Sequence, residues 1–189
     1  MNVADLLARA VGMLPPHVVN EAGRTVADVG EFLDHDEWEI ALDFLADLDA
    51  GWRPPPVWWD LLIEAADLMV LADTAAWCRW GRWESIHGII RAELTLIPPA
   101  QGGRTTAVPG RGVLRPLWDI GRRTAAGEPD LRVARVWVEY APELPPGATG
   151  SVRLAPLVPG DWRDLQPGRT ITMHERRPVA GTATIIEVA

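Results

Sequence analysis

The chain has 189 residues, of which 48% are hydrophobic and 23% charged, and its net charge is −8. This composition is typical of one globular domain or two small ones, and it excludes the polar bias of a disordered protein. All 18 basic residues are arginine. The absence of lysine excludes Schiff-base chemistry and the lysine of a phosphate-binding P-loop.

The first half of the chain has the apolar spacing of helices. Residues 5–14 form the first expected helix, and Pro15-Pro16 ends it and begins a second one that runs to about residue 33. Further helices are expected at residues 37–49, 57–71 and 75–83. Their connections are short and rich in Pro and Gly. The pattern predicts an all-helical bundle over residues 1–83.

Near Gly88 the apolar spacing changes to that of strands. Strands are expected at residues 89–97, 113–118, 132–140, 151–157, 169–174 and 179–188. Turns with Pro and Gly separate them, which favours a closed antiparallel barrel or a sandwich over residues 84–189.

Motifs in this second half occur in a recognisable order. They are Gly102-Gly103-Arg104-Thr105-Thr106, then Gly112-Val113-Leu114-Arg115-Pro116-Leu117-Trp118, and finally Ile171-Thr172-Met173-His174-Glu175-Arg176-Arg177-Pro178-Val179-Ala180-Gly181-Thr182. In this order they resemble the third domain of elongation factor Tu and related translation GTPases. The resemblance implies a six-stranded antiparallel β-barrel, so the expected fold class is α+β, a helical bundle followed by that barrel.

The departures from this family concern function. The nucleotide-binding domain is missing, so the resemblance implies no GTPase. Leu117 stands where the family has a glutamine that reads the tRNA stem, and the glycine of the closing hairpin is replaced within Glu175-Arg176-Arg177. We therefore do not expect nucleic acid as a partner.

The first half carries a second resemblance, over residues 29–47 and 60–69. The acidic, amphipathic helix pair in these segments is similar to the small helical immunity proteins of bacterial toxin systems, including the MafI and contact-dependent-inhibition groups. The resemblance implies that this half neutralises a toxin by binding it.

Charge is unevenly distributed. Residues 1–87 have 16 acidic and 5 basic side chains, which is −11, whereas residues 88–189 have 10 acidic and 13 basic ones, which is +3. Nine carboxylates lie within residues 28–49, with no arginine among them. They form either a solvated helix face or a surface that attracts a basic protein such as a nuclease.

The tryptophans beside the Pro54-Pro55-Pro56 turn also have two interpretations. They either pack in the core or serve as exposed anchors, because tryptophan is enriched in interface hot spots. The candidate partner-binding residues are Asp28, Glu31, Asp36, Glu39, Asp43, Asp47, Trp52 and Trp58.

Other local patterns indicate no catalytic, cofactor or metal site. Asp34-His35-Asp36-Glu37 is interpreted as a helix cap, because four successive residues do not converge on one metal ion. Neither Ser85 nor Ser151 lies in a G-x-S-x-G motif. The lone Cys78 and an N-terminus unlike a signal peptide predict a cytoplasmic protein, and the apolar runs are too short to span a membrane.

The sequence therefore predicts a cytoplasmic interaction protein of the immunity or antitoxin type, without enzymatic activity, whose acidic helices bind a basic toxin. The alternative is a translation-related accessory protein that binds RNA or a translation factor through its barrel.

Overall fold

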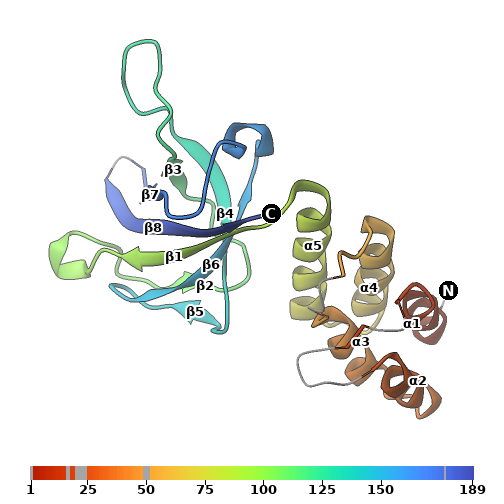
Figure 1. The fold of residues 1–189 in the computed structure, drawn as a ribbon. Coiled ribbons are helices and arrows are strands. Elements are labelled where there is room, and N and C mark those ends of the chain that lie inside the picture. The colour runs from red at the N-terminus through yellow and green to blue at the C-terminus, as the bar shows by residue number, and fades with distance from the viewer. Residues whose placement is uncertain (1, 16–17, 20–24, 49–51, 177) are drawn as a thin grey trace. The chain divides into compact units, whose positions relative to one another are not determined.

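The computed structural model describes residues 2–15, 18–19, 25–48, 52–176 and 178–189. The chain divides into two compact units, Met1–Ile86 and His87–Ala189. We call them the helical unit and the barrel unit. Five helices in the described residues precede a closed six-stranded antiparallel barrel (Figure 1), so the expected α+β class is confirmed.

The helical unit contains α1 (Val3–Val11), α2 (Val26–Asp34), α3 (Trp38–Ala46), α4 (Pro56–Leu68) and α5 (Ala72–His87). Local signals begin two of these helices. The Asn2 side chain accepts the N–H of Asp5 at 2.8 Å, and Pro56 stands at the first position of α4, where a missing N–H costs nothing.

The second helix is shorter than predicted. The expected helix to residue 33 had its start at the Pro15-Pro16 pair, but Val18 and Val19 are not helical and Val19 pairs with Thr25 in an antiparallel bridge. A capping box between Thr25 and Asp28 begins α2 at Val26. Residues 16, 17 and 20–24 lie outside the described residues.

The third and fifth helices also differ from expectation. Helix α3 ends at Ala46, and the expected end at Asp49 lies outside the described residues. Helix α5 runs from Ala72 to His87, so it is longer at both ends than the expected helix at residues 75–83. Its C-terminal end lies at His87 because the next residue, Gly88, has φ +89° and leaves the helical conformation. The predicted boundary between residues 83 and 84 therefore falls inside a helix.

The core of the helical unit comes from the apolar faces of its helices. Its fully buried leucines are Leu6, Leu7, Leu42, Leu45 and Leu62. Helix α1 packs against α2, α3 and α4, and α3 also packs against α2 and α4. This packing determines which face of α3 is left outward.

The barrel closes in the order β1-β6-β4-β3-β7-β8, with every neighbouring pair antiparallel. The strands are β1 (Ile90–Leu96), β3 (Leu117–Asp119), β4 (Arg132–Val138), β6 (Thr149–Pro156), β7 (Thr170–His174) and β8 (Val179–Val188). Two short strands, β2 (Val108–Pro109) and β5 (Glu143–Leu144), form a separate small sheet that the sequence pattern did not predict. Two residues are too few to show a period.

The strand expected at residues 113–118 is only partly present. Pro116 has no N–H, so it cannot donate a hydrogen bond to a neighbouring strand. The carbonyl groups of Leu114 and Pro116 still accept the N–H groups of Val136 and Ala134, at 3.1 and 3.4 Å. The segment therefore runs beside β4 before β3 begins.

The ends of the barrel unit are joined. Ile89 and Ala189 exchange two backbone hydrogen bonds, of 2.8 and 3.0 Å. Gly103, within the Gly-Gly-Arg motif, lies so close to Ile97 that an added Cβ would be 1.8 Å from its carbonyl oxygen. The close approach of two backbone segments explains that glycine.

Candidate functional site

Helix α3 presents a line of carboxylates. Glu39, Asp43 and Asp47 follow one another at intervals of four residues and are all exposed. That spacing places side chains on one helix face, while the opposite face buries Leu42 and Leu45. We call Glu39, Asp43 and Asp47 the acidic stripe.

The stripe borders a shallow hollow between α3 and the beginning of α5. The hollow has a volume of about 410 Å³ and is lined by Asp43, Ala46, Asp47, Asp73, Thr74 and Trp77. We call it the α3–α5 hollow. Trp77 is held in its wall, because its Nε1 donates a 2.8 Å hydrogen bond to the Ala46 carbonyl oxygen.

The pKa of the Asp43 carboxyl is shifted from its ordinary value. Its partial burial raises its pKa above the ordinary value, and the charge of Glu39 raises it further, while a hydrogen bond with the Thr74 side chain acts in the opposite direction. The ionised carboxylate is therefore held beside another negative charge. A cation placed in the hollow would relieve that repulsion.

Four of the lining residues, Ala46, Asp73, Thr74 and Trp77, were not among the candidates. The expected helix at residues 75–83 includes Trp77, but no binding role was expected for Trp77, Asp73 or Thr74. Their positions in the α3–α5 hollow depend on how α3 and α5 approach each other, and no local spacing in the sequence reports this.

The remaining acidic candidates lie elsewhere in the helical unit. The Asp28 carboxylate accepts the backbone N–H and the hydroxyl of Thr25, at 2.5 and 3.0 Å, so it is engaged in the cap of α2. Glu31 and Asp36 are exposed, on α2 and in the turn before α3. The structure therefore brings together Asp43 and Asp47, and leaves Asp28, Glu31, Asp36 and Glu39 outside the hollow lining.

The helix cap expected at residues 34–37 lies in this segment, but it has no side-chain hydrogen bond. Glu37 occupies the N-cap position of α3, and within the described residues its side chain makes no capping hydrogen bond. Asp36 instead adopts a left-handed conformation with φ +58°, which aspartate tolerates better than most residues.

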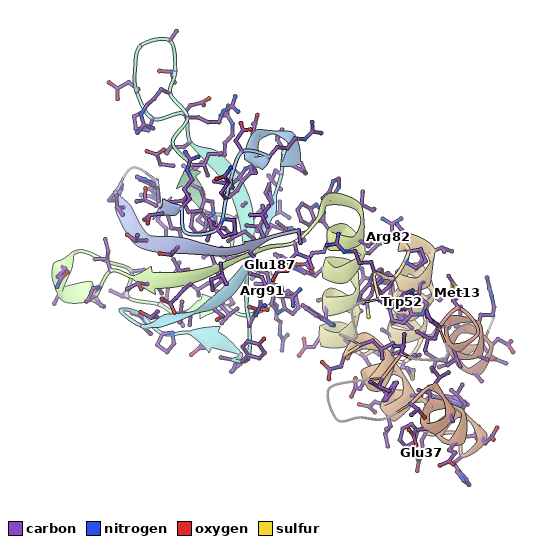
Figure 2. The ribbon with its side chains drawn as sticks, in the orientation of Figure 1. Met13, Glu37, Trp52, Arg82, Arg91 and Glu187 are labelled. Carbon is purple, nitrogen blue, oxygen red and sulfur yellow. The ribbon has the colours of Figure 1, made fainter. Side chains whose placement is uncertain are left out.

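Trp58 is a core residue and not a surface anchor. It is 0% exposed, and its Nε1 donates to the carbonyl oxygen of Ala10 at 3.1 Å. Trp52, labelled in Figure 2, is half-buried and meets Trp58 edge to face, with ring centroids 5.4 Å apart. The prediction of Trp58 as a partner contact is therefore wrong, because its whole surface is used within the helical unit.

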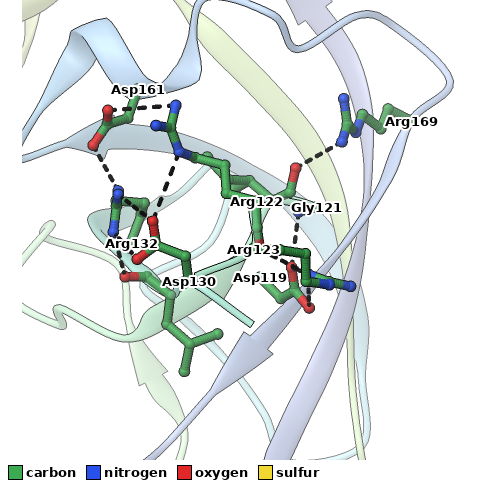
Figure 3. Close-up of polar contacts among 10 residues, drawn as sticks. Asp119, Gly121, Arg122, Arg123, Asp130, Arg132, Asp161 and Arg169 are labelled. Carbon is green, nitrogen blue, oxygen red and sulfur yellow. Dashed lines mark hydrogen bonds and ion pairs between the residues drawn. The ribbon is translucent and has the colours of Figure 1, made fainter. Parts of the chain in front are cut away.

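Arginines of the barrel unit lie in ion pairs with carboxylates. Arg132 contacts both Asp130 and Asp161, and Arg122 lies 3.9 and 3.5 Å from the same two carboxylates (Figure 3). In the same region Asp119 accepts the backbone N–H of Gly121 at 2.8 Å and the guanidinium of Arg123 at 3.0 Å.

A second group of ion pairs surrounds Glu139, whose side chain is only 5% exposed. Its two carboxylate oxygens accept from Arg91 at 3.1 Å and Arg153 at 2.7 Å. Arg91 also approaches Glu187 at 3.5 Å (Figure 2). These pairs leave less exposed positive charge around Arg91 and Arg153 than isolated arginines would present.

Among the described residues, no group of three or more His, Cys, Asp or Glu side chains is arranged to hold a metal ion. In that part of the chain no helix has both the length and the apolar character to cross a membrane. Cys78 is buried, and burial raises the pKa of its thiol to about 12. Such a thiol is a poor nucleophile.

No protein-family model matches this chain, and no curated protein matches it.

Proposed function

We propose that this chain is a non-enzymatic binding protein of the immunity or antitoxin type, which neutralises a basic, nuclease-like toxin in the cytoplasm. The observation that carries the proposal is the convergence of Asp43 and Asp47, from the acidic stripe, with Asp73 and Trp77 around the α3–α5 hollow. The role requires no cofactor, metal or catalytic group.

The chemistry of the hollow suits an arginine or lysine side chain of the partner. Asp43, Asp47 and Asp73 supply carboxylate acceptors, and the indole of Trp77 supplies a ring for a cation–π contact. Both interactions strengthen when the partner covers the hollow and excludes water. The stripe also attracts a basic protein from a distance and accelerates the encounter.

Repulsion between carboxylates on α3 lowers the free energy of unfolding, and the fold itself does not need these charges. Glu39 and Asp43 repel each other across one turn of α3, and like charges at this spacing destabilise a helix. A basic partner would convert this repulsion into attraction, as expected for a surface selected for binding.

The test compares two triple variants with the same change in charge. E39Q/D43N/D47N neutralises the stripe, and E128Q/E143Q/D164N neutralises three exposed acids of the barrel unit. The partner is first identified by capture from the native host and purified. Stopped-flow mixing at low salt should show about tenfold slower association for the stripe variant and little change for the control.

Dissociation should also become faster, because Asp43 and Asp47 hold a cation of the partner in a hollow from which the partner excludes water. The difference between the variants should shrink when the Debye length falls to about 10 Å at 0.1 M salt. Equal association rates at low salt for wild type and stripe variant would refute the acidic surface as a binding site. Co-expression of the toxin with wild type, but not with the stripe variant, should protect growth.

The alternative is a translation-related protein whose barrel binds RNA or a translation factor. A closed barrel of six antiparallel strands and the surplus of arginine over acidic residues in residues 88–189 favour it. The ion pairs of Arg91, Arg122, Arg132 and Arg153 weigh against it, because paired arginines offer less charge to phosphates. Salt-dependent binding of tRNA that E39Q/D43N/D47N does not alter would favour this alternative.

A further inference from the structure

Helix α4 ends in a left-handed turn that carries an apolar side chain. The N–H of Leu71 bonds to the carbonyl of Ala66 at 2.9 Å, and the N–H of Val70 bonds to that of Asp67 at 3.1 Å. These two bonds define a Schellman motif in which Val70 is the left-handed residue, with φ +60°.

Valine is an unfavourable residue at this position. Glycine is preferred there because it has no Cβ, and a β-branched residue with positive φ is a strong outlier. Burial does not compensate for the strain, since the Val70 side chain is 85% exposed. Folding would therefore favour glycine, whereas the chain keeps an apolar side chain directed to solvent.

A second exposed apolar side chain accompanies it. Leu68, the last residue of α4, is 52% exposed. We call Leu68 and Val70 the apolar turn. Exposed branched side chains on a tight, hydrogen-bonded turn lose little conformational entropy on binding, which suits them to protein contacts.

Carboxylates near the apolar turn favour a positively charged partner protein. Asp73, three residues after Val70, belongs to the first turn of α5 and lines the α3–α5 hollow. Thr74, also in the first turn of α5, forms a side-chain hydrogen bond with Asp43 of the acidic stripe. A partner that covers the turn therefore meets carboxylates next to it.

We propose that the apolar turn is the hydrophobic anchor of a docking surface for a basic protein segment, one that presents an apolar side chain beside an arginine or lysine. The apolar side chain contacts Leu68 and Val70, and the cation enters the α3–α5 hollow. This inference rests on the proposed function and adds the anchor to the acidic surface.

The probe is a fluorescein-labelled helical peptide with leucines along one face and arginines beside them. Two matched peptides replace every leucine with serine or every arginine with glutamate. Fluorescence anisotropy measures their Kd for the full chain, for the stripe variant E39Q/D43N/D47N and for three further variants. V70G and L68S remove the apolar turn, and Y140G is the matched control.

Tyr140 suits the control because it too is 85% exposed with φ +60°, but it lies in the barrel unit. V70G and Y140G both replace a strained exposed residue with glycine. V70G should raise the thermal midpoint and yet weaken binding of the leucine–arginine peptide by about tenfold. Y140G should leave that Kd unchanged, and the serine peptide should be insensitive to V70G.

The outcomes separate this inference from the proposed function. If the stripe variant E39Q/D43N/D47N weakens peptide binding while V70G and L68S do not, the acidic surface stands and the apolar anchor is refuted. If the leucine–arginine peptide binds no better than the glutamate peptide, both are refuted. A higher thermal midpoint together with a weaker affinity for the peptide in V70G supports the anchor. Partial unfolding of the variant would instead lower the thermal midpoint as well as the affinity.

Discussion

The indole N–H of Trp77 donates a 2.8 Å hydrogen bond to the backbone carbonyl of Ala46. Ala46 is the last residue of α3, where helix carbonyls lack intrahelical donors. One side chain from α5 thus satisfies a group at the end of α3 and fixes the wall of the α3–α5 hollow.

Trp77→Phe should lower the free energy of unfolding by about 1 kcal/mol, the usual net value of a hydrogen bond of this kind. The phenyl ring retains most of the apolar contact but has no donor for Ala46. Urea unfolding followed by circular dichroism measures the change. An unchanged midpoint would show that water replaces the donor without loss.

Two helical glycines should respond oppositely to alanine. A Cβ at Gly81 in α5 would lie 2.5 Å from the ring of Trp59, whereas a Cβ at Gly30 in α2 meets nothing within 4 Å. We expect Gly81→Ala to destabilise the chain by about 2 kcal/mol through overpacking. Gly30→Ala should stabilise it by about 0.5–1 kcal/mol, because alanine restricts the unfolded chain and favours the helix.

Thermal unfolding of both alanine variants tests this pair. Each substitution adds one methyl group to a helix, so helix propensity alone would make both stabilising. Stabilisation by Gly81→Ala would mean that the ring of Trp59 does not lie against Gly81.

Asp43→Asn should stabilise the chain at neutral pH. The pKa of Asp43 is raised in the folded state, so the folded chain binds the Asp43 proton more tightly than the unfolded chain does. The charged form of this carboxylate therefore lowers the stability of the fold. This penalty is present above the folded pKa and disappears as the pH falls below the ordinary value of 3.8. Urea titrations near pH 7 and near pH 3 should show a gain at the higher pH only.

Asp119→Asn should have the opposite effect. Burial alone would raise the pKa of Asp119, but the N–H of Gly121 and the guanidinium of Arg123 outweigh burial and lower it. The ionised carboxylate therefore stabilises the fold above the ordinary value of 3.8, and this contribution is lost as the pH falls through the lower folded pKa. The variant should be less stable than wild type at neutral pH and approach it in strong acid.

The chain should bind no GTP. It has no lysine to contact the phosphates, and no Gly-rich phosphate loop follows the P-loop pattern. Calorimetric titration of the purified chain with GTP and magnesium should give only heats of dilution. A saturable micromolar site would overturn this prediction and would favour the translation-related alternative.

The classes of secondary structure follow from local patterns. Leu42 and Leu45 are spaced so that α3 buries one face, and this alone places Glu39, Asp43 and Asp47 on the opposite one. Alternation of apolar residues predicted five of the six barrel strands over most of their length; the exception, β3, follows Pro116, whose effect on pairing depends on the neighbouring strand.

Residues close together in the chain are enough to predict the helical and strand halves, the uneven charge and the line of carboxylates. Tertiary packing alone decided that Asp73, Thr74 and Trp77 join Asp43 and Asp47, some thirty residues earlier. It also buried Trp58 while leaving Trp52 half-exposed, although both flank the same proline turn. Burial depends on which helices cover a side chain, and the period of a single helix carries no information about its neighbours.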